Sequence, residues 1–494
     1  MNRALAWMVA LAVGAAGAAV MTIEVAGAQV LAPDFGIGLY AWAAMITVAL
    51  GGLALGYALG GLLADRWDRH AHRLLAGALA LAGITCSTDP LLWDAEAVVR
   101  LARLGPRFGA ALTAATLFLP AFIGLGVAYP LAVKLWTRRV DEVGRRAGWL
   151  SAASALGSLL GAGLAGFVLV PTFALETVFA GTAAALLIMA AGVLLLGSRA
   201  RLTGAALLAL ACWPLCMPSA PLPESVLCRR GSLFGPLEVW QSGILRHLLV
   251  ARSIQAISTG DPPTSYMPYT RMISGMLFHS VHPERHKVLV IGLGAGFIPR
   301  ELDPIPCETV EIDPAVVQAA ETYFAFDRRK FPVHEMDGRA FLRTQPGPYE
   351  AVVIDAFRGF DLPHHLVTRR CFQLIKRRLH PEGILVLNFH GFLEGEHDRL
   401  ARSLEATLRA VFDRVEVAVC MDTPPHGNAI FAAYGPDAFV EWPQNDRYTI
   451  LRRLEERSAA PPAESAVGPA LVLTDSPNPV ALWCARTPRR REVP

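Results

Sequence analysis

Glycines and acidic residues that follow short apolar runs are the residues of this sequence best suited to chemistry. Val288–Ile291 is almost wholly apolar, as expected of a strand buried on both faces of a sheet, and Gly292, Gly294 and Gly296 follow it closely. Glycines at such a place let the backbone turn sharply and let a ligand approach the main chain. Glu311 ends the next apolar run, about twenty residues further on, where a carboxylate can accept hydrogen bonds from both hydroxyls of a ribose. We therefore predict a nucleoside-binding site at the carboxyl edge of a parallel sheet.

The glycine spacing and two further acids narrow the class of nucleoside. A dinucleotide-binding loop would read GxGxxG, but Phe297 stands at the position of the last glycine. The loop suits S-adenosylmethionine or a relative of it equally well. Asp337-Gly338 follows the third predicted strand, where the carboxylate can accept a hydrogen bond from an adenine amine. Asp355 ends the fourth strand, where it can take up a proton or orient a nucleophile. Either aspartate could instead only cap a helix, but the features together favour an adenosyl-sulfonium donor.

These residues need a sheet to bring them together, and the pattern after residue 280 predicts one. Apolar runs alternate with helical segments such as 314–323 and 368–379, which is typical of a doubly wound, Rossmann-like sheet. The predicted strands are Val288–Ile291, Thr309–Ile312, Val333–Glu335, Ala351–Ile354 and Ile384–Phe389, with a last β pair at Val415–Val419 and Ala429–Ala433.

The chain divides into a membrane half and a soluble half. Its composition, 53% apolar and 18% charged, is too apolar for an ordinary soluble protein, and the excess lies before about Ala220. Stretches long enough to span a bilayer as helices lie at 4–30, 39–64, 72–88, 108–136, 147–170 and 174–196, the third being the weakest. We expect a membrane domain of six or seven helices at 1–217, a linker at 218–230, a small antiparallel β domain at 231–280, a catalytic domain of the S-adenosylmethionine-methyltransferase type at 281–440 and a C-terminal extension at 441–494.

Basic residues orient the membrane domain. Lys and Arg gather in the loops after the second, fourth and sixth stretches, and such loops are usually cytoplasmic. Leu202–Met217 is short for a span and is broken by Pro214. If it crosses, the soluble half lies outside the cytoplasm. Because a nucleoside cofactor is made in the cytosol, we expect a multi-pass protein of the cell membrane whose catalytic domain is cytosolic.

Charge and cysteine content exclude two classes of site. The net charge of +3 comes without a basic stripe, so the sequence gives no reason to expect a nucleic-acid partner. The eight cysteines are scattered and show no paired spacing for zinc. We expect no metal.

Seven motifs follow one another over about 230–435: SLFGPLEVW (232–240), SIQAIS (253–258), KVLVIGLGAG (287–296), VEID (310–313), MDGRAFL (336–342), VVIDAF (352–357) and HPEGILVLN (380–388). Their order and spacing resemble those of the spermidine synthases. The first half resembles the membrane domain fused to this enzyme in some bacterial multi-pass members. LAPDFG (31–36), LALGYALGG (53–61) and LGSLLGAGLAG (156–166) carry that second match.

The resemblance implies an aminopropyltransferase of polyamine biosynthesis. The family moves an aminopropyl group from decarboxylated S-adenosylmethionine to an amine, without a metal. By that likeness Glu311 binds the ribose, Asp337 binds the adenine and Gln255 lines the donor pocket. Tyr269 would flank the acceptor amine, and Asp355 would be the catalytic carboxylate that orients or deprotonates it. The expected partners are a small-molecule amine or related acceptor and the lipid bilayer, with a homo-oligomer left open.

The sequence departs from the family at charged positions. The family has an acid in the glycine loop where this chain has Ala295, and acids in the diamine pocket at the positions that align with Arg271 and Arg358. A cation placed against two arginines would be repelled. Asp361 could replace the missing acid only if its loop refolds. Both arginines could also point to solvent or pair with nearby acids.

Two alternatives therefore stand beside aminopropyl transfer. The first keeps the fold but transfers a methyl or aminocarboxypropyl group from S-adenosylmethionine itself to an acceptor other than a diamine. The second is a transporter or membrane sensor whose soluble domain binds a nucleoside without catalysis. His364 and His365 lie on the same loop as Arg358, and we expect them to line the pocket or the surface.

Overall fold

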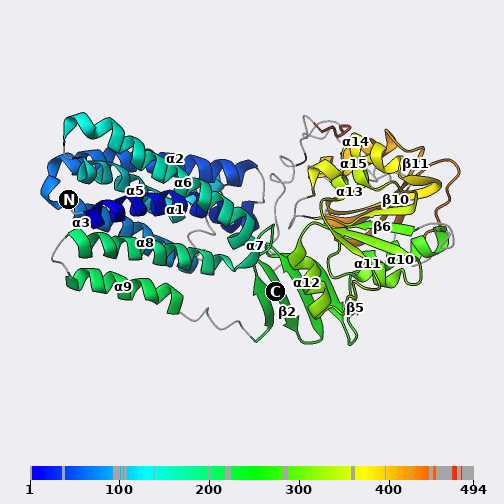
Figure 1. The fold of residues 1–494 in the computed structure, drawn as a ribbon. Helices are drawn as coiled ribbons and strands as arrows, with labels where there is room; N and C mark the ends of the chain where they lie inside the picture. The colour runs from blue at the N-terminus through cyan, green and yellow to red at the C-terminus, as the bar shows by residue number, and fades with distance from the viewer. Residues whose placement is uncertain are drawn as a thin grey trace. The chain divides into compact units, whose positions relative to one another are not determined.

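The structure is a computed structural model of the full chain, and it divides into two compact units (Figure 1). Unit 1 comprises Met1–Glu224 and Arg229–Pro236, and unit 2 comprises Ser225–Cys228 and Leu237–Pro494. The structure describes residues 3–475 and residue 480, except for 36–38, 93–100, 102–103, 105–107, 138, 198–200, 217–223, 282–286, 358–361, 395–396, 424–425, 444–448 and 452–469.

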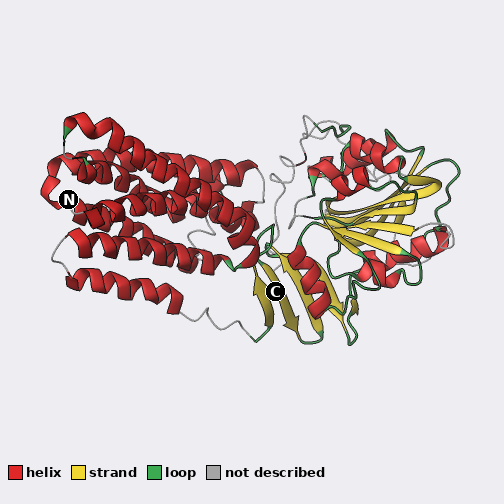
Figure 2. Cartoon of the chain, in the orientation of Figure 1, coloured by secondary structure: helices red, strands yellow, loops and turns green. Residues whose placement is uncertain are grey.

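Unit 1 is a bundle of long apolar helices that run side by side (Figure 2). They are α1 (Arg3–Phe35), α2 (Leu39–Arg66), α3 (Ala71–Leu92), α5 (Phe108–Trp136), α6 (Val143–Leu164), α7 (Val170–Thr172), α8 (Leu175–Gly197) and α9 (Arg201–Cys216). Within the described residues, five of these segments are long and apolar enough to cross a membrane: Arg3–Ala32, Tyr40–Arg66, Phe108–Trp136, Val143–Thr172 and Leu175–Gly197. The third predicted stretch, 72–88, forms α3 but is not among the five.

Small residues let α1 and α6 touch along their backbones. A Cβ atom added to Gly157 would collide with the backbone of Gly14, and one added to Gly161 would collide with the backbone of Ala18. The Ser158 hydroxyl donates a hydrogen bond to the carbonyl of Gly17 at 3.2 Å. Close helix packing through small residues is the usual solution where no water drives helices together.

The end of the bundle differs from a series of simple spans. After α6 the chain forms a π-helical turn at Ala165–Leu169 before α7. The ambiguous stretch 202–217 forms α9, which has 16 residues and so rises only about 24 Å. Gly204 of α9 packs against the Leu195 side chain of α8, so α9 lies along its neighbour within this unit.

The smaller sheet has five strands in sequence order: β1 (Val226–Arg230), β2 (Leu237–Ser242), β3 (Leu245–Val250), β4 (Ser253–Thr259) and β5 (Thr264–Ser265). Strands β2 to β5 pair antiparallel with their neighbours, as the alternating pattern predicted. Strand β1 lies inside 218–230, so the prediction that this whole range is a linker is wrong. The strand was missed because VLCRR ends in two arginines and does not show the alternation of a strand.

The larger sheet of unit 2 carries the glycine loop and the acidic residues that the sequence predicts to form the site. Its strand order is β13-β11-β12-β10-β9-β6-β7-β8. The strands are β6 (Lys287–Ile291), β7 (Cys307–Glu311), β8 (Val333–Glu335), β9 (Tyr349–Ile354), β10 (Leu379–Phe392), β11 (Arg414–Thr423), β12 (His426–Tyr434) and β13 (Thr449–Leu451). Strands β6 to β10 are parallel to one another, while β12, β11 and β13 extend the sheet beyond β10 with antiparallel pairings.

Helices cover both faces of this sheet (Figure 1). They are α10 (Pro268–Ser280), α11 (Phe297–Glu301), α12 (Pro314–Tyr323), α13 (Gly338–Thr344), α14 (Arg369–Lys376) and α15 (Arg399–Arg409). Val288 and Val290 of β6 pack with α10 and α11, whereas Leu289 and Ile291 pack in the cluster that holds α13 to α15. This alternation confirms the prediction of a strand buried on both faces, and the strand order confirms a Rossmann-like domain.

Candidate active site

The glycine loop after β6 is shaped by three glycines with positive φ, at +100° for Gly292, +54° for Gly294 and +75° for Gly296. A Cβ on Gly292 would collide with the backbone of Asp355, and one on Gly296 would collide with the ring of Phe326. A Cβ on Gly294 would meet no atom closer than the carbonyl oxygen of Gln255 at 4.0 Å. The first and third glycines are therefore needed for packing, and the second leaves open space above the main chain.

Glu311, the last residue of β7, fixes this loop through a hydrogen bond to its backbone. Its two carboxylate oxygens accept hydrogen bonds from the backbone amides of Leu293 and Asp313, each at 2.9 Å. The side chain is 9% exposed. Burial raises the pKa of Glu311 to about 7, against the opposing effect of the two amides. Glu311, which is predicted to bind the ribose, thus faces the glycine loop, and its carboxylate oxygens keep lone pairs that can accept further hydrogen bonds.

Asp337 lies just beyond the end of β8 and begins α13. One oxygen caps the helix by accepting from the Ala340 amide at 2.9 Å, and the other pairs with Nε2 of His365 at 2.6 Å. This pairing, the largest influence, lowers the pKa of Asp337 to about 2. The cap that the sequence offered as an alternative is present, and it occupies one oxygen of the two. Gly338 packs against the Ile291 side chain, which places Asp337 beside the end of β6.

Asp355 follows β9 and lies next to the glycine loop, because its amide donates to the Ile291 carbonyl at 2.9 Å. One carboxylate oxygen accepts from the Asn388 amide at 2.7 Å, and the other accepts from the Tyr269 hydroxyl at 3.3 Å. Asp355 is half-buried, and desolvation raises the pKa of its carboxyl to about 6, against the opposing effect of the Asn388 and Tyr269 hydrogen bonds. Burial and the neighbouring Asp355 also raise the pKa of Tyr269 well above 10.

A chain of buried amides extends behind Asp355. Asn388 of β10 accepts a hydrogen bond from the Asn428 amide of β12 at 2.7 Å. Asn428 also donates to the Phe389 carbonyl at 3.0 Å and accepts from the Cys420 thiol at 3.0 Å. Both asparagines are 2% exposed. Because each amide has its partners fixed, Asn388 must present its N–H groups to Asp355.

The remaining predicted residues take varied positions. The backbone carbonyl oxygen of Gln255 lies next to Gly294 of the glycine loop. The side-chain amide of Gln255 donates to the Ser253 carbonyl at 3.3 Å. Arg271 is exposed on α10 and reaches the Ser265 carbonyl at 3.5 Å. Arg358 and Asp361 lie outside the described residues. In the described part of the chain, no group of three or more His, Cys, Asp or Glu side chains could hold a metal ion.

Sequence reasoning missed two polar residues of this region, Asn388 and Asn428. A signal existed for both, since each interrupts an otherwise apolar strand in which asparagine is normally rare. His365 was expected at the pocket or the surface, but its pairing with Asp337, 28 residues away in the sequence, was not predicted.

The arrangement as a whole is suited to bind a nucleoside and to accept one proton from a substrate. Glu311, Asp337 and Asp355 stand at or just beyond the carboxyl ends of β7, β8 and β9; β7 and β9 flank β6 and its loop, and β8 is the next strand beyond β7. Glu311 and Asp337, the acceptors predicted for ribose and base, lie to one side of the loop, and Asp355, whose carboxyl has a pKa of about 6, lies to the other. A carboxyl poised there is ionised near neutral pH and can accept a proton.

Comparison with known proteins locates one family domain. Residues 266–440 match the model of the spermine/spermidine synthase domain. This range includes the glycine loop, the three carboxylates, Tyr269 and Asn388.

Individual relatives and a solved structure are similar to parts of this chain. The polyamine aminopropyltransferase of Vibrio vulnificus is 35% identical over 170 residues, which are 32% of this chain and 54% of that protein. The polyamine aminopropyltransferase of Chromobacterium violaceum is 28% identical over 215 residues, covering 42% and 79% of the two chains. A crystal structure of a probable spermidine synthase from Corynebacterium glutamicum aligns at 19% identity and a TM-score of 0.38, covering 42% and 79%. The chain thus spans about half the length of the first of these relatives.

Proposed function

We propose that this protein, whose residues 266–440 match the spermine/spermidine synthase domain, transfers an aminopropyl group from decarboxylated S-adenosylmethionine to an amine acceptor. The observation that carries the proposal is the site around the loop after β6. Three carboxylates on neighbouring strand ends surround that loop, and the Tyr269 hydroxyl binds the carboxylate suited to accept a proton.

The donor would bind through the glycine loop and two of the acids. The open space at Gly294 lets the nucleoside approach the main chain, and Glu311 accepts hydrogen bonds from the ribose hydroxyls. Asp337 accepts from the adenine amine, and Gln255 lines the same pocket. An ionised Glu311 and Asp337 also suit a positively charged sulfur compound, since opposite charges attract in a partly buried site.

The transfer step needs alignment and one base. The lone pair of a neutral amine attacks the methylene carbon bonded to the sulfonium, so a C–N bond forms while the C–S bond breaks. The bonding electrons go to sulfur, which leaves as a neutral thioether nucleoside. The new ammonium passes its extra proton to Asp355, and Tyr269 and Asn388 hold that carboxylate in place. Holding the two reactants in line lowers the barrier, because the entropy of bringing them together is lost on binding and not in the transition state.

A second candidate transfer deserves a direct test. Ala295 is buried in the glycine loop where the family has an acid, and Arg271 is exposed on α10, two residues after Tyr269. Both features suit a donor or acceptor that carries a carboxylate. Calorimetry with decarboxylated S-adenosylmethionine and with S-adenosylmethionine separates the two donors. Tighter binding of the carboxylated form, with turnover, would replace aminopropyl transfer by methyl or aminocarboxypropyl transfer.

The apolar helices of unit 1 support a multi-pass membrane anchor, and we place the soluble domain in the cytosol where its donor is made. The basic loops and the 16 residues of α9 support this placement, since a full span needs about 20 residues. Labelling a single cysteine at Glu224 with an impermeant reagent in intact cells tests it. Labelling without lysis would place unit 2 on the outer side.

The sharpest test of catalysis is Asp355→Asn in the full-length protein. Loss of the proton acceptor should lower product formation about 100-fold or more, while binding of 5′-methylthioadenosine stays within about twofold of wild type. Asp413→Asn, which removes an exposed partner of Lys376, serves as the control with unchanged turnover. Full activity of Asp355→Asn would reject the proposed role. If wild type turns over no donor with any amine, a nucleoside-binding sensor or transporter becomes the better description.

A further inference from the structure

Residues 470–475, here called the C-terminal strap, are packed into unit 2 although they lie outside the matched range 266–440. The Leu471 amide donates to the Ser403 hydroxyl at 3.0 Å, and the Leu473 amide donates to the Thr407 hydroxyl at 2.9 Å, both on α15. The Leu473 carbonyl accepts from the Arg369 amide of α14 at 2.9 Å. Leu473 is 0% exposed and belongs to the core cluster of α13 to α15. The strap is therefore an integral part of the fold.

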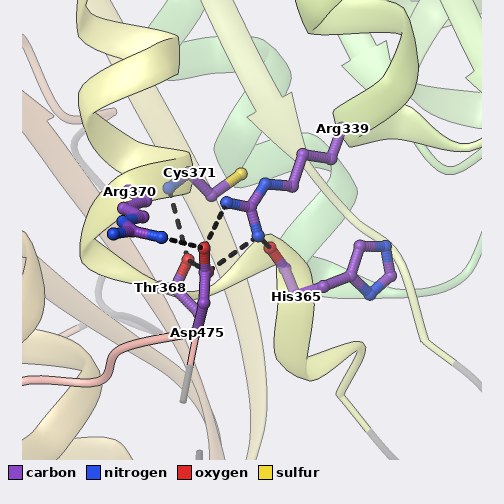
Figure 3. A network of polar contacts seen from close by, with 6 residues as sticks. All are labelled: Arg339, His365, Thr368, Arg370, Cys371 and Asp475. Carbon is purple, nitrogen blue, oxygen red and sulfur yellow. Dashed lines mark hydrogen bonds and ion pairs between the residues drawn. The ribbon is translucent and has the colours of Figure 1, made fainter.

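Asp475 at the end of the strap is bound by residues of two helices, α13 and α14 (Figure 3). Both of its oxygens accept from the Arg339 guanidinium of α13 at 2.8 Å, in a two-pronged pair. One oxygen also accepts from the Thr368 hydroxyl at 2.8 Å, and Thr368 caps the first turn of α14. Arg370 lies 3.6 Å away. Such bidentate pairs are among the strongest and most directional polar contacts in proteins.

Arg339 connects Asp475 to the part of the site that is proposed to bind the nucleoside. Its guanidinium also donates to the His365 carbonyl at 3.1 Å, and Figure 3 shows Arg339 between Asp475 and His365. The ring of His365 pairs with Asp337 at 2.6 Å. One arginine and one histidine thus connect Asp475 to the carboxylate proposed to read the adenine.

Removing the charge of Asp475 would release a largely buried cation. The Arg339 side chain is 12% exposed, and a buried charge without its partner is costly. Asp337 lies two residues earlier at the start of the same helix, and its charge already acts on Arg339. A freed guanidinium would turn toward Asp337 and compete with His365 and with the adenine amine.

We infer that Asp475 is a positioning residue for base recognition, acting through Arg339 and His365 to hold Asp337 toward the adenine. The inference rests on the proposed function, because it needs a nucleoside donor at Asp337. It makes the strap, rather than the matched domain alone, responsible for the preference for adenine over other bases.

The test compares two probes that differ only at the base. Calorimetry on the full-length protein measures the dissociation constants of 5′-methylthioadenosine and 5′-methylthioinosine, which lacks the 6-amine. Asp475→Asn should reduce the preference for the adenine compound about tenfold, the scale of one hydrogen bond to a charged group. Asp475→Glu should restore much of it. Asp398→Asn, which removes the partner of Arg402 on α15, should leave the preference unchanged.

The outcomes separate this inference from the proposed function. A merely structural role would weaken both probes equally and leave their ratio unchanged, and that result would overturn the inference. If wild type shows no preference for the adenine compound, the proposed adenine site fails first. Should Asp475→Asn not fold, Arg339→Lys keeps the positive charge but removes the two-pronged contact. It should lower the same ratio, and an unchanged ratio in Arg339→Lys would also reject the role of Asp475.

Discussion

At the scale of single residues, the three acids of the site have distinct proton affinities because their surroundings differ. Burial raises the pKa of Glu311 to about 7 and that of Asp355 to about 6. The contact with His365 lowers the pKa of Asp337 to about 2. Ionised Asp337 is thus present throughout the physiological range, whereas Glu311 and Asp355 lose their charge as the pH falls through 7 and 6. Both donor binding and catalysis should therefore weaken on acidification.

Asn388→Ala tests how Asp355 is tuned. The Asn388 amide favours the ionised carboxylate, so its loss should raise the pKa of Asp355 and move the acidic limb of the pH–rate profile upward. A hydrogen bond to a charged group corresponds to a shift of about one pH unit. Single-turnover rates at saturating donor and acceptor, measured from pH 5 to 9, report the shift. An unmoved limb would mean that another group sets it.

At the scale of elements, the glycine loop separates a packing role from a binding role. Gly292→Ala would push a Cβ into the backbone of Asp355, whereas Gly294→Ala would place it in open space. Gly294→Ala should lower the free energy of unfolding by only about 1–2 kcal/mol, the cost of a left-handed conformation, yet weaken 5′-methylthioadenosine binding at least tenfold. Gly292→Ala should lower the melting temperature far more. Normal nucleoside affinity in Gly294→Ala would show that no ligand occupies that space.

Local sequence signals predicted much of this element structure, and the misses have physical causes. The apolar runs at Val288–Ile291 and Ala351–Ile354 form β6 and β9, because strands buried on both faces leave little choice of residue. Strand β1 and strand β13 have no such signature, since edge strands need only half of their side chains buried. Asn428 pairs with His390 in the strand register, and its diagonal reach to Asn388 exists only once β12 has joined the sheet.

At the scale of the whole molecule, contacts between distant segments were the least predictable part. Arg339 and Asp475 are 136 residues apart, and no sequence pattern in either segment predicts that the two side chains pair. The helices of unit 1 were predicted from apolar length alone, which identifies spans well but says little about which helices are neighbours. The glycines of α6 suggested close packing, and the structure supplies α1 as the partner.

Gly161→Leu tests whether that helix pair holds unit 1 together. The new side chain would collide with the backbone of Ala18, and overpacking of this kind costs about 1–3 kcal/mol. The melting temperature of the detergent-solubilised protein should fall. Gly163→Leu, whose Cβ would meet no atom within 4 Å, is the matched control and should melt like wild type. Equal melting of both variants would exclude a close contact between α1 and α6.

The contact between Ser158 and Gly17 also has a consequence for how the chain is made. The two residues are 141 positions apart, and ribosomes add about 5–20 residues per second. The first helix is therefore synthesised on the order of ten seconds before its partner. If unit 1 is the membrane anchor proposed above, the row of small residues on α1 faces lipid or a chaperone during that interval, so translation orders the assembly of this unit.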